Sequence, residues 1–343
     1  MRRREFIGFV GGVAAWPVVA RAQQPERVYH IALAHPSNPA SALSETGTPF
    51  YRVFFEELRR LGHVEGRNLA VARYSAEGRN ERHAEIAREV VRTKPDVVVT
   101  VGSRMALSFT AASSTIPVVA VAGDPVALGV AASFARPGRN FTGSTSNTGP
   151  EYYAKLLELL KEAIPTLSTV GIIAPPAPWT PLLASQQQPM GNPVGLAMQD
   201  AALRLGIQLI PGLLGRYEED DYRNLFGAMV QKQVDAILTS DLAENFTHRR
   251  LILELAETNR LPTMSLYTEI VEIGGLIAYA PDLKAQFRYL AFCVDKILRG
   301  ENPGEIPIYQ SARFNLAINL KTAKALGLVI PASLVARADE VIE

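Results

Sequence analysis

The 343-residue sequence has few of the features that tie a chain to a special environment. It contains one cysteine and carries a formal net charge of only +1, and past residue 22 no apolar run approaches a membrane-spanning length. Without a second cysteine there is no intrachain disulfide, so a folded core must supply the stability. The balanced charge excludes the basic surface typical of nucleic-acid-binding proteins. Cys293 lies between Phe292 and Val294, which predicts a buried apolar residue and not a nucleophile.

Motifs of the common enzyme classes are also missing. The five histidines lack the spacing of metal sites such as H-E-x-x-H, and no G-x-S-x-G nucleophile elbow occurs. There is no G-x-G-x-x-G turn after a strand and no G-x-x-x-x-G-K-[ST] loop, so nucleotide binding is not indicated. These absences count against an enzyme, and the sequence predicts no catalytic residue, no metal and no cofactor.

The first residues have the layout of an export signal. A basic start is followed by an apolar middle rich in Gly and Ala, and by the small-x-small sequence ARA at positions 20–22. The sequence RREFI at positions 3–7 resembles a twin-arginine signal. We therefore expect residues 1–22 to be a cleaved signal peptide and the mature chain to be a soluble periplasmic protein. Its loss removes four arginines and one glutamate, which changes the net charge from +1 to −2.

Strand-like and helix-like segments alternate along the rest of the chain. Apolar runs such as 96–101 and 234–240 predict buried strands. The segment 49–62 predicts a helix with four apolar residues on one face, Phe50, Phe54, Leu58 and Leu61. This alternation is typical of parallel sheets covered by helices on both faces. The sequence therefore predicts an α/β protein with two doubly wound, Rossmann-like lobes. We expect lobe 1 to span 28–143 plus about 270–312, and lobe 2 to span 146–266 plus about 313–343.

Ligands of such sheets bind at the carboxyl ends of the strands, and several polar residues fall there. Gly102 and Ser103 end one strand and open a helix; Ser103 either only caps that helix or also binds a ligand carboxylate with the free N–H groups. Asp124, before Pro125 and a predicted helix, either caps it or receives a ligand ammonium.

Other strand ends add further candidate ligand-binding residues. Ser37 lies in a polar loop after the first strand, where a lone His35 is more often structural than a ligand contact. In the second half Asp241, Tyr267 and Tyr279 each end a strand, and a tyrosine there either packs a ligand or belongs to the core. The proline-rich segment 174–195, which carries Trp179, is either a lid over the cleft or a tolerated surface insertion.

Ordered blocks of the sequence resemble one family. The segments GDPVALGVAASFARPGRNFTG at 123–143 and LRRLGHVEGRNLAV at 58–71 are similar to those of ABC-transporter substrate-binding proteins related to tryptophan-binding TrpX lipoproteins. The segments HRRLILELAETNRLP, GGLIAYAPDL and the last 30 residues resemble later blocks of that family. Arg139 and His63 depart from its pattern, where a glycine and a tyrosine are usual.

The resemblance implies a type I periplasmic-binding-protein fold, with two lobes joined by a hinge of crossing strands. It also implies delivery of a small solute to a membrane permease and its ATPase. The residues that fall at the family's cleft-lining loops are Ser37, Ser103, Asp124, Thr145, Ser146, Asn147 and Asp241.

We therefore expect a monomeric solute-binding protein whose lobes close on its ligand. The solute would be an amino acid or an aromatic or aliphatic organic acid. Its carboxylate would meet Ser103 and helix N–H groups, and an ammonium would meet Asp124 or Asp241. Two alternatives are an exported α/β enzyme that uses Asp124 or Asp241 as a base, and a ligand-sensing domain of a membrane receptor.

Overall fold

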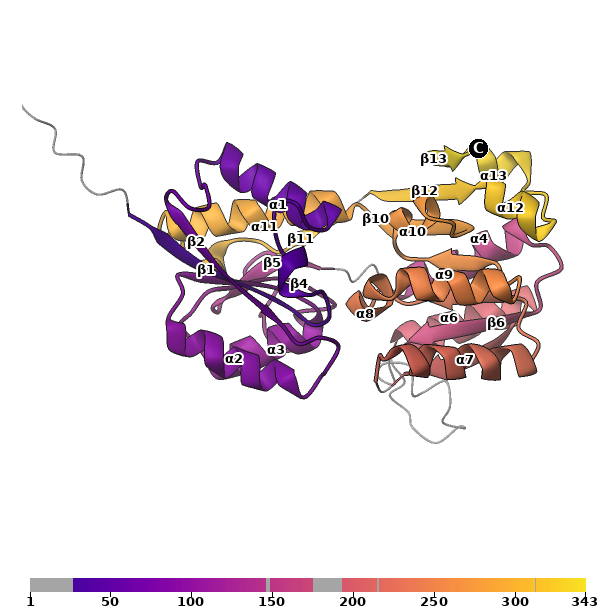
Figure 1. Ribbon diagram of the computed structural model, residues 1–343, viewed down its shortest axis with the longest axis horizontal. Coiled ribbons are helices and arrows are strands. Elements are labelled where there is room, and N and C mark those ends of the chain that lie inside the picture. The colour runs from indigo at the N-terminus through magenta and orange to yellow at the C-terminus, as the bar shows by residue number, and fades with distance from the viewer. Residues whose placement is uncertain (1–26, 146–148, 175–192, 215, 312) are drawn as a thin grey trace, which may run out of the picture.

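The computed structural model describes all residues except 1–26, 146–148, 175–192, 215 and 312. It has two α/β lobes that lie side by side, each built on its own sheet (Figure 1). The prediction of two lobes with parallel-dominated sheets is confirmed.

The sheet of lobe 1 has the strand order β11-β5-β4-β3-β1-β2, and all of its pairs are parallel. Its strands are β1 (Tyr29–His35), β2 (Leu69–Ser75), β3 (Val97–Val101), β4 (Val118–Ala122), β5 (Phe141–Thr145) and β11 (Tyr309–Gln310). Its helices are α1 (Pro49–Arg60), α2 (Arg82–Thr93), α3 (Ser103–Ala112) and α11 (Leu283–Leu298), with short 3-10 turns η1 (Ala40–Ala42) and η3 (Pro303–Glu305).

Alternate residues of β1 explain how lobe 1 is layered. Ile31 and Leu33 pack with α1 and α11 on one face, whereas Ala32 and Ala34 pack with α2 and α3 on the other. Both sets are buried, which is why the middle of the strand, residues 31–34, is apolar without a break and does not alternate with polar residues.

The sheet of lobe 2 has the order β13-β12-β10-β9-β8-β6-β7, in which β10 and β12 are antiparallel and the other described pairs are parallel. Its strands are β6 (Thr169–Ala174), β7 (Gln208–Leu213), β8 (Ala236–Thr239), β9 (Thr263–Ser265), β10 (Ile277–Pro281), β12 (Phe314–Asn319) and β13 (Glu340–Ile342). The helices are α4 (Pro150–Ala163), α6 (Pro193–Leu205), α7 (Glu219–Gln231), α8 (Ala243–Thr247), α9 (Arg249–Thr258), α10 (Thr268–Glu272), α12 (Leu320–Leu326) and α13 (Ala332–Val335).

The two lobes share one strand order, because β2-β1-β3-β4-β5 corresponds to β7-β6-β8-β9-β10. Helices α4 and α6 pack on one face of the second sheet and α7 and α9 on the other. The order reverses beside β1 in lobe 1 and beside β6 in lobe 2, where crevices form at the carboxyl ends of such sheets.

The chain crosses between the lobes three times: after β5, between β10 and α11, and between β11 and β12. Residues 270–281 therefore lie in lobe 2 and not, as the sequence analysis expects, in lobe 1. The physical reason is the short connection: β10 follows β9 after only the short helix α10, and it pairs with β9 in the same sheet. Figure 1 shows α11 returning to pack beside α1 in lobe 1.

Candidate functional site

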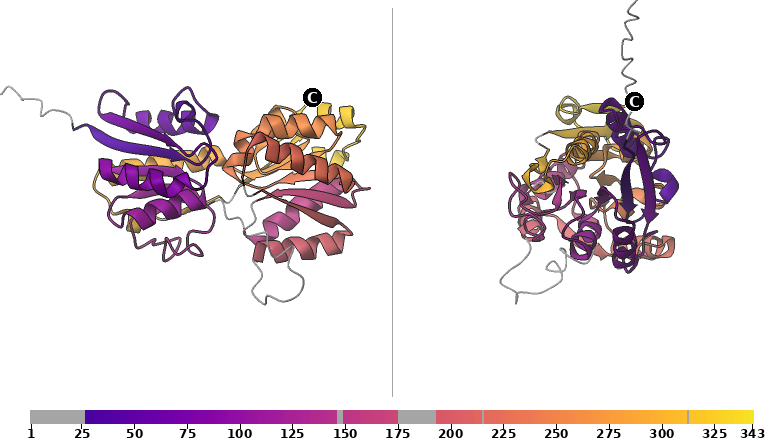
Figure 2. Two further views of the ribbon diagram at one scale, coloured as in Figure 1. Left: turned by 60° about the horizontal axis from the view of Figure 1, so that its bottom comes forward. Right: turned by 90° about the vertical axis from the view of Figure 1, so that its left-hand side faces the viewer.

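The carboxyl ends of the two sheets face each other across the boundary between the lobes. The hydroxyl of Ser37, in the loop after β1, lies 2.8 Å from the hydroxyl of Thr247 at the end of α8. A Cβ added to Gly78, after β2, would lie 4.0 Å from the carbonyl oxygen of Tyr217, after β7. Helix α8 lies on the side of lobe 2 that faces lobe 1 (Figure 1), and the two lobes still lie side by side in the turned view on the left of Figure 2. The loops after β1 and β2 of lobe 1, including candidate residue Ser37, therefore meet α8 and the segment after β7 of lobe 2.

Ser103 in lobe 1 does not cap its helix. Gly102 occupies the N-cap position with a φ of 88°, a conformation that favours glycine, and the helix begins at Ser103. The Ser103 hydroxyl instead accepts the N–H of Gly123 at 2.9 Å, and Thr145 Oγ1 donates to the Gly123 carbonyl. Gly102, Ser103 and Thr145 therefore lie at the same edge of the sheet of lobe 1. The hydroxyls of Ser103 and Thr145 hydrogen-bond to the N–H and the carbonyl of Gly123, in the loop after β4.

Asp124 does act as a cap. Its Oδ1 accepts the N–H groups of Val126 and Ala127, each at 3.0 Å. The expected helix near Pro125 is wrong, because residues 125–129 form a single turn that ends at Gly129 with a φ of 73°. An Asp-Pro pair starts a turn and a helix equally well, so the sequence does not distinguish them.

In lobe 2 Asp241 and Tyr267 lie in contact. The Tyr267 hydroxyl donates to the Asp241 backbone carbonyl at 2.7 Å. The Asp241 side chain is bonded to the hydroxyl of Tyr153, and burial followed by the charge of this carboxylate raises the pKa of Tyr153. Asp241 itself is exposed. A carboxylate thus stands at this sheet edge with one phenol held against it.

An aromatic group lies near this carboxylate, and of its members only Tyr279 is a candidate from the sequence. The rings of Tyr152 and Tyr279 stack at 5.8 Å, and Phe314 lies 5.3 Å from both. The charge of Asp241, after burial, raises the pKa of Tyr152, which indicates that the carboxylate and these rings are neighbours. The pair Tyr152-Tyr153 in the first turn after a lobe crossing is the signal from which this group can be found.

A second carboxylate, Glu244 on α8, is 4% exposed and was also not predicted. Burial raises its pKa, and the charge of Arg104, from the first turn of α3 in lobe 1, opposes that rise. His35 is buried and structural: its Nδ1 accepts the N–H of Ser37 at 3.1 Å and of Asn38 at 2.8 Å, and burial lowers its pKa to about 3.

Three predicted ligand-binding residues, Ser146, Asn147 and Trp179, lie outside the described residues. Two surface hollows of about 240 and 520 Å³ are found elsewhere, the first at the β10–α11 crossing and the second beside α3. None of the seven predicted residues that the structure describes lines them. Within the described part of the chain there is no cluster of three side chains suited to a metal ion, and no helix is long and apolar enough to cross a membrane.

The chain is similar to known proteins in its sequence. Residues 49–342 match the model of a family described as ABC transporter substrate binding protein. A tyrosine-binding protein of Clostridioides difficile is 21% identical over 277 residues, which cover 80% of this chain and 75% of that protein.

Solved structures show the same fold. A conserved domain protein of Vibrio cholerae O1 biovar El Tor is similar with a TM-score of 0.76 at 24% identity, over 92% of this chain and 100% of that one. An ABC domain from Streptococcus pneumoniae in complex with L-Trp has a TM-score of 0.75 at 20% identity, with the same coverage.

Proposed function

The chain belongs to the family of ABC transporter substrate binding proteins, and from this premise we propose that it is the periplasmic solute-binding component of an ABC importer. The observation that carries the proposal is the meeting of the two sheet edges, which places polar groups of both lobes around one boundary. A solute that bridges the lobes favours the closed state by its differential affinity. No covalent step is needed.

We further propose that the solute bears a carboxylate and that aromatic amino acids are the first class to test. Helix α3 begins at the carboxyl end of β3, and the N–H groups of its first turn have no acceptor within the helix, which suits an anion. The stacked rings of Tyr152, Tyr279 and Phe314 suit an aromatic side chain. The relatives named for tyrosine and bound to L-Trp support the same choice.

For the ammonium we favour Asp241 over Asp124. One oxygen of Asp124 already accepts two backbone N–H groups as a cap, whereas Asp241 is exposed beside the phenols. Ser146, Asn147 and Trp179 stay in the proposal as candidate contacts, as do Gly102, Ser103 and Thr145.

The experiment is a thermal-shift screen of residues 23–343 against amino acids and matched organic acids. A ligand at 100 times its Kd stabilises the folded state by about 2.7 kcal/mol. We expect L-tryptophan or L-tyrosine to shift the melting temperature more than analogues without the amine or without the carboxylate. If a polyol or sugar shifts it and no carboxylate does, the proposed ligand class is wrong.

A second measurement separates transport from catalysis. Solute recovered unchanged after prolonged incubation is expected for a binding protein, and turnover would favour the enzyme. In vesicles that contain the cognate permease and ATPase, the loaded monomer should stimulate ATP hydrolysis.

A further inference from the structure

Thr247, the last residue of α8, joins the two lobes directly. Its hydroxyl lies 2.8 Å from Ser37 Oγ and donates to Asn38 Oδ1 at 2.9 Å. The side chains of Ser37 and Asn38 belong to lobe 1 and are 6% and 7% exposed. If such a contact breaks and water does not replace it, buried donors and acceptors are left without partners, which raises the free energy of the molecule.

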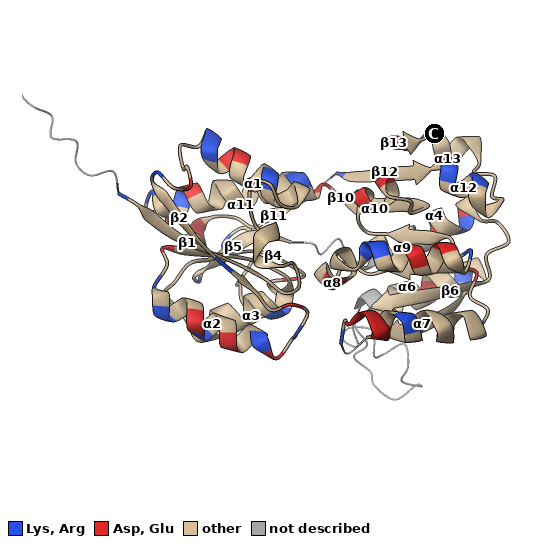
Figure 3. Cartoon of the chain, viewed as in Figure 1, with Lys and Arg blue, Asp and Glu red and all other residues tan. Residues whose placement is uncertain are grey.

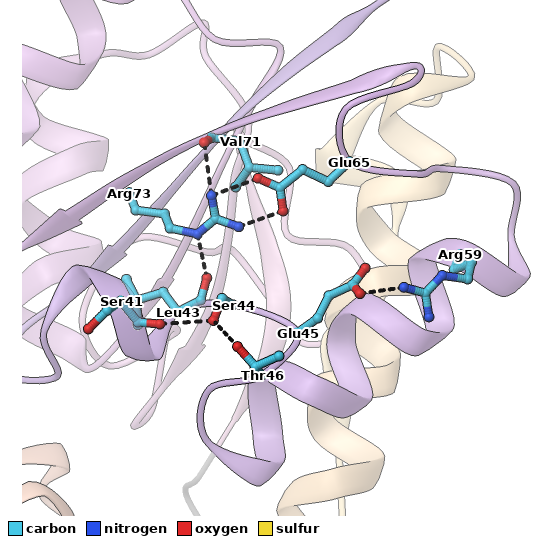
Figure 4. Close-up of polar contacts among 9 residues, drawn as sticks. All are labelled: Ser41, Leu43, Ser44, Glu45, Thr46, Arg59, Glu65, Val71 and Arg73. Carbon is cyan, nitrogen blue, oxygen red and sulfur yellow. Dashed lines mark hydrogen bonds and ion pairs between the residues drawn. The ribbon is translucent and has the colours of Figure 1, made fainter.

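The lobe 1 side of this contact is held from several directions. His35 accepts the N–H groups of both Ser37 and Asn38, so the loop has one backbone conformation. Farther along the same loop, Arg73 donates to the Leu43 carbonyl at 2.7 Å and forms a two-bond ion pair with Glu65 (Figure 4). The hydroxyl of Ser37 is therefore presented on a rigid support.

The lobe 2 side is held equally well. Asn245, fully buried on α8, donates to the Ile173 carbonyl at the end of β6 and to the Ser240 carbonyl after β8, both at 3.3 Å. Its Oδ1 accepts the hydroxyl of Tyr222, from α7, at 3.0 Å. Helix α8 is thereby fixed to the carboxyl edge of its own sheet and carries Thr247 toward lobe 1.

Apolar packing adjoins the polar contact. The ring of Phe246 lies 5.2 Å from Phe50 of lobe 1 and 4.9 Å from Tyr267 of lobe 2. Phe50 in turn stacks at 5.5 Å on Phe287, in the second turn of α11 after a lobe crossing. The Thr247 contact thus stands beside the hinge and also at the facing sheet edges, where opening of the lobes would separate its two sides.

We propose that Thr247 is a positioning residue for solute binding, which stabilises the closed arrangement of the lobes through Ser37 and Asn38 without touching the solute. This rests on the proposed function. If only the closed state binds tightly, the apparent Kd is the intrinsic Kd divided by the closed fraction. Loss of the contact lowers that fraction, so solute leaves faster while its association rate changes little.

The test compares Thr247→Val, which keeps the shape and removes the hydroxyl, with Thr247→Ser, which keeps the hydroxyl. The matched control is Thr258→Val, because the Thr258 hydroxyl donates to the Glu254 carbonyl in its own helix. The single hydroxyl hydrogen of Thr247 is instead shared between two acceptors, the Ala243 carbonyl of its own helix at 3.0 Å and Asn38 Oδ1 of lobe 1 at 2.9 Å. Each variant also carries Arg92→Cys and Lys232→Cys, two exposed positions on α2 and just after α7, for a fluorescence measurement of the distance between the lobes.

We expect Thr247→Val to shift the ligand-free distance distribution toward separated lobes and to raise the dissociation rate of the bound amino acid about three- to tenfold. Thr247→Ser should restore both values, and Thr258→Val should change neither. The distance is measured without ligand, so it tests Thr247 even if the screen finds no amino acid that binds.

A second variant guards against a general loss of structure. Ser37→Ala removes the other side of the contact. The double variant should change the distance between the lobes and the dissociation free energy by less than the sum of the two single variants, because both substitutions break the same interaction. Unchanged distances in a folded Thr247→Val protein, or strictly additive effects of the two substitutions, would overturn the proposal.

Discussion

Some residues at the boundary between the lobes can be identified from their position in the sequence, and others are recognised only in the folded structure. The position of Asp241 at a strand end marks it as a site candidate, and the structure places phenols around it. Glu244 and Thr247 have no such mark, because each is defined by its proximity to a residue of lobe 1 far away in the sequence. A contact between residues 210 positions apart leaves no local pattern, so Ser37 can be predicted as polar and near the cleft but not as a partner of Thr247.

At this scale the two aspartates can be told apart. We expect Asp241→Asn to weaken binding of an amino acid roughly 10- to 100-fold, because a charged hydrogen bond to the ammonium is lost. Its affinity for the matched acid without the amine should stay the same. Asp124→Asn should leave the preference for the amine intact and act on stability through the turn at 125–129. Calorimetric titration with both ligands decides the matter, and the reverse result would assign the ammonium to Asp124.

Glu244 makes stability depend on pH. Its folded pKa is raised by burial, so between pH 4.5 and that raised value the folded state holds a proton that the unfolded state has lost. Stability from this group is therefore greatest at low pH and falls by up to about 1.4 kcal/mol per unit as pH rises through this window. The groups around it are Arg104 of lobe 1 and, in lobe 2, Tyr217 and Tyr222, whose pKa values are raised by burial and then by Glu244.

We therefore expect Glu244→Gln to be more stable than the parent at neutral pH and to lose this part of the pH dependence. Denaturant titrations from pH 4.5 to 8 measure it, with Glu257→Gln on an exposed face of α9 as the control. A Glu244→Gln protein that is less stable at every pH would show that the attraction between Glu244 and the charge of Arg104 outweighs the cost of burial.

At the scale of elements the sequence predicts most of the structure, because amphipathic helices and doubly buried strands have distinct apolar periods. The helix expected at 49–62 is α1. Of its predicted inward residues, Phe50, Phe54 and Leu58 are buried, whereas Leu61, at the C-cap, is partly exposed. The turn at 125–129 and the lobe assignment of 270–281 escape prediction for a different reason. Both depend on how far a short segment continues and to which sheet it returns, which tertiary packing decides.

Two glycines test the packing of elements in opposite directions. A side chain at Gly143 on β5 would place its Cβ 2.1 Å from the Ala120 carbonyl oxygen at a φ of 132°, so we expect Gly143→Ala to destabilise by roughly 3 kcal/mol or more. Gly227 in α7 is exposed with open space around it, and Gly227→Ala should stabilise by about 0.5–1 kcal/mol. Urea unfolding measures both changes; a tolerated Gly143→Ala would mean that β4 and β5 can move apart.

At the scale of the whole molecule, two lobes bring the edges of their sheets together, and residues 1–22 remain a predicted export signal. Acidic and basic residues are interspersed along both lobes in the view of Figure 3, as expected of a chain with nearly balanced charge. The sheet order repeats, so two similar halves each supply one side of the boundary.

Export is the prediction at this scale. We propose that the RREFI sequence at positions 3–7 directs twin-arginine export and that the chain is cleaved after Ala22. Replacement of Arg3 and Arg4 by lysines should retain the precursor in the cytoplasm, as cell fractionation and intact mass would show. Normal export of that variant would point to a different secretion route.

The burial of Cys293 has a practical consequence for following this molecule at work. Its side chain is fully enclosed by lobe 1, and burial raises the pKa of the thiol to about 12, so the thiolate that maleimides need is scarce at neutral pH. A cysteine introduced on the surface would then be the favoured site for a dye without removal of the native one. With a dye attached near the boundary between the lobes, the fluorescence of the protein would report the binding of its solute.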